Sequence, residues 1–165
     1  MNRTVAFAVV ALLVAAAPVI ATAEANKACG LLTAAELESV LAAKVSGLSS
    51  GATGVKDVQM CTGSTPAARI LLRIAKSRGN SKDAAAKGIE IARQMGAQVD
   101  LKTFGPITCS SFIPPKDKEV YGFNTTCTVT KGDSVAGVEI TAKSRAAMIP
   151  IDKLHPLAEK MAARF

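Results

Sequence analysis

Residues 105–143 read GPITCSSFIPPKDKEVYGFNTTCTVTKGDSVAGVEITAK, and apolar residues recur there at alternate positions. Side chains alternate between the two faces of a β-strand, so this pattern predicts antiparallel strands with one buried face. The expected strands are Ile107 to Ile113, Tyr121 to Lys131 and Ser134 to Lys143. We expect the rest of the chain to fold around this three-stranded meander.

The two loops of the meander fix the register of its strands. The first hairpin loop is centred on Lys118, and the second turn, Lys131-Gly132-Asp133-Ser134, has glycine where a two-residue hairpin needs a positive φ. The expected pairs are Cys109 with Cys127, Ile107 with Val129 and Ile113 with Phe123 in the first hairpin, and Val129 with Ala136, Cys127 with Val138 and Thr125 with Ile140 in the second. Both hairpins therefore bury the same face.

The other face of the meander is predicted to be a flat field of hydroxyl and amide groups. Such a face is either only solvated or a docking surface, and Phe112 would be the natural anchor of a docked partner. The candidate binding face comprises Thr108, Ser110, Phe112, Asn124, Thr126, Thr128, Glu139 and Thr141.

Residues 1–23 have the three parts of a Sec-type signal peptide. Arg3 is the positive n-region, an apolar run follows, and Ala21-Thr22-Ala23 is a small-x-small cleavage pattern. A single membrane anchor is the alternative, because about 17 apolar residues reach the lower bound for spanning a bilayer. We expect cleavage near Ala23 and a periplasmic or secreted protein.

Residues 24–165 are expected to form a single α+β domain with one core. Removal of Arg3 lowers the net charge from +7 to +6, and no second apolar run in this part could cross a membrane. The basic residues are dispersed, and the chain has one Tyr and no Trp. Nucleic-acid binding is therefore not expected.

The four cysteines predict two disulfides, because their number is even and the chain is expected to be exported. No C-x-x-C occurs, the spacings of 32, 48 and 18 residues fit no zinc pattern, and the only histidine is His155. The register of the meander favours Cys109 with Cys127, which leaves Cys29 with Cys61. No metal or other cofactor is predicted.

Three helices are predicted outside the meander. Thr33 and Glu36 form a capping box at the start of the first. The second runs from Ser81 to Met95 and stops at Gly96. The last begins near Asp152 and carries an apolar stripe at helical spacing.

Three further segments complete the expected sheet and its loops. Arg69 to Ser77 alternates as a strand would, although Pro66 and Gly79 could also bracket a helix there. Val99 to Thr103 is expected as a short strand, and Gly47 to Gly54 as a mobile loop. The predicted fold is α+β: an antiparallel sheet of four to five strands with helices packed on one face, in the order α-β-β-α-β-β-β-α.

The sequence carries no pattern of known catalytic chemistry. His155 has no candidate nucleophile nearby in sequence, the cysteines are assigned to disulfides, and no carboxylates form a recognisable pair. No catalytic residue is predicted. The leading hypothesis is a non-catalytic module that binds an envelope protein or a small ligand, and the alternative is an envelope hydrolase or an inhibitor of an envelope enzyme.

Several short motifs carry a resemblance. These are Cys29-Gly30-Leu31-Leu32-Thr33-x-x-Glu36, the later Cys61, the Lys131-Gly132-Asp133 turn and the closing Leu157-Ala158-x-x-Met161. The chain resembles small exported bacterial proteins and lipoproteins of unknown function with the same start. It departs from the lipoproteins because Asn26-Lys27-Ala28 before Cys29 is no lipobox, and from many members in its second cysteine pair. The resemblance implies an α+β sandwich in the cell envelope and no transferable catalytic residues.

Overall fold

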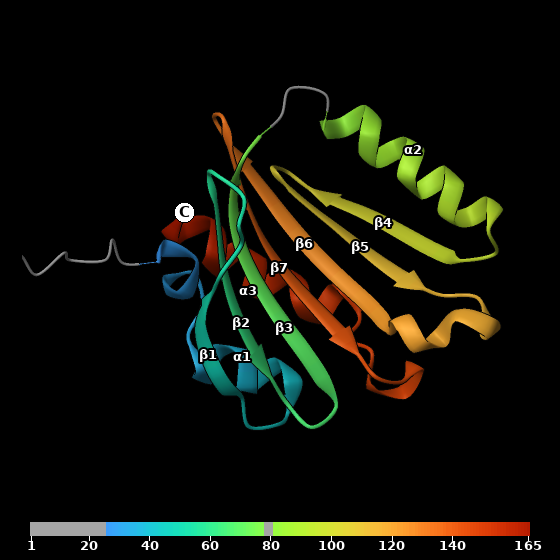
Figure 1. Ribbon diagram of the computed structural model, residues 1–165, viewed down its shortest axis with the longest axis horizontal. Coiled ribbons are helices and arrows are strands. Elements are labelled where there is room, and N and C mark those ends of the chain that lie inside the picture. Colours follow the sequence, from blue (N-terminus) through green and yellow to red (C-terminus); the bar gives the residue numbers. More distant parts are fainter. Residues whose placement is uncertain (1–25, 78–80) are drawn as a thin grey trace, which may run out of the picture.

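A computed structural model describes residues 26–77 and 81–165, and Figure 1 shows a twisted sheet with helices on both of its faces. The predicted signal peptide lies outside the described residues. The strands are β1 (Ser46–Gly51), β2 (Val58–Ser64), β3 (Ala68–Lys76), β4 (Gln98–Phe104), β5 (Ile107–Ile113), β6 (Phe123–Lys131) and β7 (Ser134–Ala142). The α-helices are α1 (Ala34–Leu41), α2 (Ser81–Gln94) and α3 (Ile151–Arg164), and the 3-10 helices are η1 (Lys27–Gly30), η2 (Lys116–Tyr121) and η3 (Arg145–Ala147).

The strands form one antiparallel sheet in the order β1-β2-β3-β7-β6-β5-β4. It consists of two meanders, β1 to β3 and β4 to β7, whose last strands lie side by side. These strands, β3 and β7, pair from Ala68 opposite Ala142 to Lys76 opposite Ser134. We call this contact the β3–β7 seam. It joins two parts of the sheet that are distant in sequence.

The predicted register of β5, β6 and β7 is confirmed. Cys109 lies opposite Cys127, and the second hairpin pairs Cys127 with Val138. Gly132 has the φ of 57° that its turn requires. The expected pair of Ile113 with Phe123 falls beyond the last paired position of the first hairpin, which is Phe112 with Asn124.

The predicted number and order of strands are wrong. The sheet has seven strands rather than four to five. The segment from Gly47 to Gly54, expected to be a loop, contributes most of β1. Its Ser/Gly-rich sequence has no alternation, and its register with β2 shifts between Ser46 and Ser49, so the usual signal of a strand is missing. The segments predicted as strands from Val99 and from Arg69 form β4 and β3.

The core lies on the inner face of the sheet, which we define by Cys109, Cys127 and Val138, all fully buried. α3 packs on β5, β6 and β7, and α1 packs on α3 behind the sheet in Figure 1. The apolar stripe of α3 is buried as predicted, and each fully buried leucine contributes about 2 kcal/mol of hydrophobic stabilisation. Its buried residues are Ile151, Leu154, Leu157, Ala158 and Met161.

α2 lies over the opposite, outer face of the sheet, alongside β4 (Figure 1). Its Ile89 lines a hollow together with Leu101 of β4 and Val135 of β7. The prediction that the helices pack on one face is therefore wrong for α2. The physical reason is that the outer face also carries apolar side chains near its edge, and they give α2 a surface to pack against.

Both predicted disulfides are present. Cys29–Cys61 joins η1 to β2, and Cys109–Cys127 bridges β5 and β6. The capping box of Thr33 and Glu36 is also present at the start of α1. Within the described ranges, no helix combines the length and apolar character needed to cross a membrane.

Candidate functional site

The residues of the candidate binding face all lie on the outer face of the sheet, and each is half-buried. Cross-strand pairing sets Thr108 opposite Thr128 and Ser110 opposite Thr126. Thr126 is in turn opposite Glu139 on β7. The register therefore gathers these polar side chains into one row across three strands.

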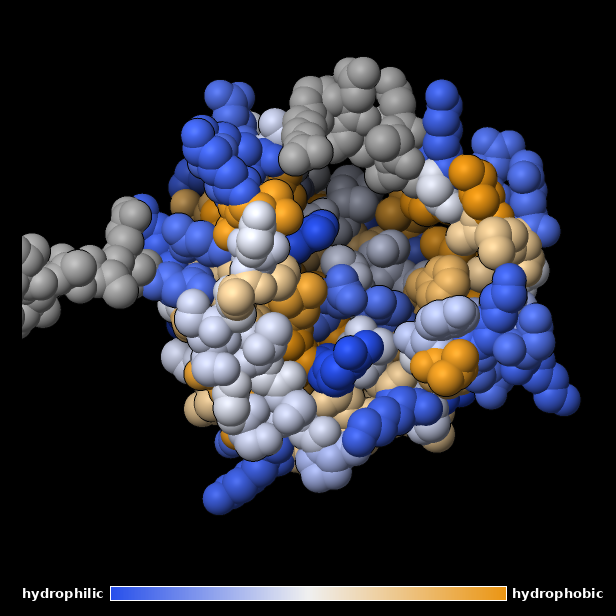
Figure 2. Space-filling view, viewed as in Figure 1, coloured by the Kyte–Doolittle hydropathy of each residue, from blue (hydrophilic) through white to orange (hydrophobic). Residues whose placement is uncertain are grey.

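The row lies in a hollow rather than on a flat surface. The cavity has a volume of about 450 Å³, and Figure 2 shows this face of the molecule hollowed near its centre. Its lining includes five of the candidate residues, Thr108, Ser110, Thr126, Thr128 and Glu139, together with Arg73, Ile89, Leu101, Thr130 and Val135. The depth of the cavity comes from the twist of the sheet and from α2, which contributes Ile89.

Five side chains with hydroxyl groups form the floor of this hollow. We call them the hydroxyl face: Thr108, Ser110, Thr126, Thr128 and Thr130. Thr128 donates a long hydrogen bond of 3.4 Å to the carbonyl of Thr108. A hydroxyl can donate one hydrogen bond and accept two. The floor can therefore satisfy both the donors and the acceptors of a polar ligand.

Arg73 is the cation of the hollow, and its side chain lies over Gly137. The two residues are paired across the β3–β7 seam. A Cβ atom at position 137 would lie 3.5 Å from Nε and 3.6 Å from Cγ of Arg73. The arginine side chain therefore runs across the sheet directly over the glycine. No hydrogen bond or ion pair engages its guanidinium among the described residues, which leaves its donors open to a ligand.

Glu139 is held in place by its neighbours on the outer face. Its Oε1 accepts a hydrogen bond of 3.1 Å from Nδ2 of Asn124 and a longer one of 3.5 Å from the hydroxyl of Thr141. The Oδ1 of Asn124 is buried without a hydrogen-bond partner. Asn124 and Thr141 thus support the wall of the hollow and do not line it.

Phe112, the predicted anchor, lies in a neighbouring hollow of about 330 Å³. This second hollow is mostly apolar and lies between the end of α2 and η2. Its lining consists of Ala92, Met95, Ala97, Phe112, Pro114, Pro115, Lys118 and Tyr121. Met95 and Tyr121 are 55% and 73% exposed, so the rim of this hollow presents apolar surface to solvent.

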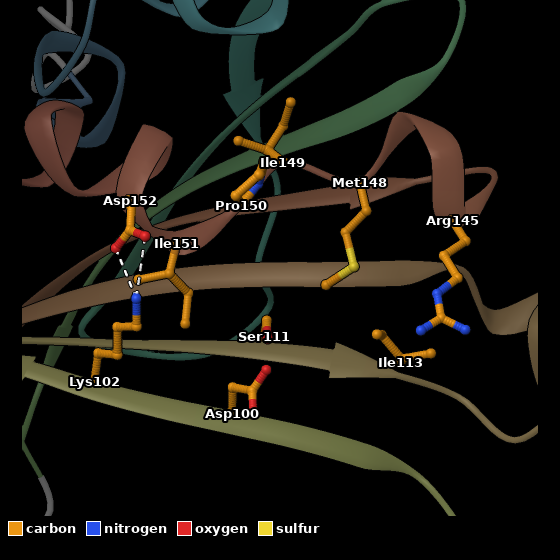
Figure 3. A pocket seen from close by; sticks show the side chains of 10 residues that line it. All are labelled: Asp100, Lys102, Ser111, Ile113, Arg145, Met148, Ile149, Pro150, Ile151 and Asp152. Atoms are coloured by element: carbon orange, nitrogen blue, oxygen red, sulfur yellow. Dashed lines mark hydrogen bonds and ion pairs between the residues drawn. The ribbon is translucent and has the colours of Figure 1, made fainter.

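A third pocket, which we call the inner pocket, opens on the inner face between β4, β5 and the start of α3 (Figure 3). Its volume is about 330 Å³. This pocket was not predicted from the sequence. Its ionisable side chains are Asp100, Lys102, Arg145 and Asp152, and its remaining lining is Ser111, Ile113, Met148, Ile149, Pro150 and Ile151. One signal was available: Asp100 and Lys102 alternate with Val99 and Leu101 along β4.

The strongest electrostatic perturbation lies outside all three pockets. Hydrogen bonds from Arg164 lower the pKa of Glu36 to about 2.

His155, expected to have no catalytic part, stacks on Phe104 with ring centroids 3.9 Å apart. In the described part of the chain, no three His, Cys, Asp or Glu side chains are grouped as metal ligands.

Comparisons with protein-family models, with curated proteins and with solved structures find no match to this chain.

Proposed function

We propose that this protein is an exported, disulfide-stabilised, non-catalytic binding module of the bacterial cell envelope. Its partner is a protein of the envelope that inserts an extended segment into the hollow above the hydroxyl face. The observation that carries the proposal is that five hydroxyl groups and Arg73, which has no ion pair among the described residues, line one cavity of about 450 Å³.

The chemistry of the hollow suits a peptide segment. An extended backbone presents N–H donors and C=O acceptors in alternation, and hydroxyl side chains can pair with both. Arg73 can donate to a carbonyl or a carboxylate of the partner. Because the floor belongs to a sheet braced by Cys109–Cys127, little ordering entropy is lost when a partner binds.

The apolar hollow around Phe112 supports the same proposal. Ile89 and Ala92 are three residues apart on α2, and each lines one of the two hollows. The hollows therefore lie next to one another beneath one helix. A partner segment that places its backbone over Ser110 can place an apolar side chain against Phe112, which is the usual arrangement of a binding anchor.

The proposed location rests on the disulfides and on the sequence. Two disulfides in one small domain are typical of an oxidising compartment. The signal-peptide pattern of residues 1–23 and the resemblance to small exported bacterial proteins favour the periplasm or secretion.

Site-specific photocrosslinking in the exporting cell tests this proposal. A photoreactive residue at Ser110 or Thr128 should crosslink to a discrete partner. The same residue at Glu159, which is exposed on α3, should not. A Thr126→Lys substitution, which fills the hollow with a charged chain, should abolish the crosslink from Ser110. Equal crosslinking from Glu159, or a crosslink that survives Thr126→Lys, would rule out the hydroxyl face as the docking site.

A further inference from the structure

The inner pocket is a polar site on the mostly apolar inner face of the sheet. β4 and β5 pair Asp100 with Ser111, and both side chains point into the pocket in Figure 3. The pocket lies on the opposite side of the sheet from the hydroxyl face. An inference about it is therefore independent of the proposed function.

The charges of the inner pocket divide into one pair and two single groups. Lys102 Nζ lies 2.8 Å and 3.1 Å from the two carboxylate oxygens of Asp152, so these two residues neutralise each other. Asp100 forms no ion pair with any described residue. Arg145 has none either, and its one hydrogen bond is a long one of 3.4 Å to Oε1 of Gln98. The pocket thus offers one anion and one cation to a ligand.

The hydroxyl of Ser111 is a further polar group of the inner pocket. Ser111 is 9% exposed, and no hydrogen bond of its hydroxyl is found within residues 26–77 and 81–165. The Ser111 oxygen is not fully buried, so it is open to the pocket and can form a hydrogen bond with a ligand there. Ile113, Met148 and Ile151 form apolar walls around it.

The size of the inner pocket limits the length of the ligand. Arg145 donates to Gln98, which is two residues from Asp100 along β4, so both single charges belong to the same side of the pocket wall. The cavity of about 330 Å³ lies at the small end of ligand pockets.

We propose that the inner pocket binds a short peptide with free termini and an apolar side chain. The N-terminal ammonium pairs with Asp100, and the C-terminal carboxylate pairs with Arg145. The peptide group accepts a hydrogen bond from Ser111. The apolar side chain packs between Ile113 and Met148. Recognition of both termini restricts the site to small peptides, because a longer chain cannot place both ends in the pocket.

Calorimetric titration of the full, disulfide-bonded protein with alanyl-leucine and two blocked forms tests this inference. N-acetyl-alanyl-leucine lacks the ammonium, and alanyl-leucinamide lacks the carboxylate. Each blocked form should bind at least about tenfold more weakly than the free dipeptide, since a charged hydrogen-bonded pair is lost. The absence of saturable binding, or equal affinity for all three probes, would overturn the inference.

Two variants and their controls assign the ends of the ligand. Asp100→Asn should bind the free and the acetylated dipeptide equally, and Arg145→Gln should bind the free and the amidated dipeptide equally. Asp117→Asn on η2 and Arg69→Gln on the outer face, as matched controls, should retain the wild-type preferences. The side chains replaced in all four variants are exposed, so the variants should fold. Retention of both preferences by Asp100→Asn and Arg145→Gln would show that the dipeptide binds elsewhere.

Discussion

Arg164 donates one hydrogen bond from each terminal nitrogen to the carboxylate of Glu36, Nη1 to Oε2 and Nη2 to Oε1, both at 2.7 Å. The same Nη1 also donates to the carbonyl of Leu31 at 3.0 Å. Glu36 meanwhile accepts a hydrogen bond from the backbone N–H of Thr33 in the capping box. One carboxylate therefore both caps α1 and ties the last helix to the first.

We expect Glu36→Gln to lower the free energy of unfolding at neutral pH and to have little effect near pH 2. Hydrogen bonding from Arg164 lowers the pKa of Glu36 from 4.5 to about 2. The unfolded chain takes up this proton at a higher pH than the folded protein does. The stabilisation is therefore complete above pH 4.5 and is lost as the pH falls toward 2. Urea unfolding of both proteins across this range measures the difference. Glu119→Gln, at an exposed site, is the control. A difference that stays constant down to pH 2 would contradict the assignment.

Thr125→Val should destabilise the protein by about 1 to 3 kcal/mol, the cost of leaving a buried polar group unpaired. The fully buried hydroxyl of Thr125 donates a hydrogen bond of 2.6 Å to the carbonyl of Ile149. The change removes this bond at nearly constant volume. Thr126→Val, at the next position on the outer face, should change stability by no more than about 0.5 kcal/mol. Chemical denaturation of the two variants measures the two changes in the free energy of unfolding. Equal decreases would show that the hydrogen bond to Ile149 does not stabilise the protein more than the hydroxyl of Thr126 does.

Two glycine substitutions should have different effects on stability. Gly122 has a φ of +83°, and a Cβ there would lie 2.7 Å from Cγ2 of Thr141. Gly122→Ala should therefore cost about 1 to 3 kcal/mol. A Cβ at Gly137 meets nothing closer than 3.4 Å, and no positive φ is required there. Gly137→Ala should leave stability unchanged or raise it by up to about 1 kcal/mol, because alanine restricts the unfolded chain. Thermal unfolding decides the order of the two, and a reversed order would exclude this explanation.

Replacement of Cys109 and Cys127 by alanine should cost about 2 to 5 kcal/mol, the usual effect of removing a native disulfide from a small exported domain. Both residues are fully buried in the core, so the change also leaves a small apolar gap. Thermal melts of the wild type with and without reductant, after verified reduction of both bonds, provide the second measurement. An unchanged midpoint in both experiments would show that the sheet holds without this brace.

The register of β5, β6 and β7 was predictable because a tight turn connects β6 to β7 and a pair of cysteines aligns β5 with β6. A turn with glycine at position 132 and two cysteines facing each other leave only one alignment with a single apolar face. β1 was not predictable, since its sequence from Ser46 to Gly51 contains one apolar residue, Leu48. A local sequence pattern can predict a hairpin. It cannot predict a strand whose only stabilisation is pairing with a neighbouring strand.

Of the candidate site, only the hydroxyl groups that form the floor of the hollow were predictable from the sequence. The hydroxyl groups of β5 and β6 follow from alternation along those strands. Alternation along β3 places Arg73 on the polar side of its strand, yet its position over Gly137 depends on the β3–β7 seam, which no local pattern encodes. Ile89 reaches the hollow because α2 crosses to the outer face. The inner pocket depends on the same kind of long-range contact, between β4 and α3.

The β3–β7 seam also has a consequence for how the chain folds. Neither disulfide crosses it: Cys29–Cys61 braces the first meander and Cys109–Cys127 the second, over separations of 32 and 18 residues. The seam joins positions from 58 residues apart, Lys76 with Ser134, to 74 residues apart, Ala68 with Ala142. Contacts between distant residues require costly loop closure and form slowly. We therefore expect each meander, with its own covalent brace, to form first and the two meanders to dock last. In that order Arg73 meets Gly137 only on docking, and the hollow above the hydroxyl face is completed by the event that completes the fold.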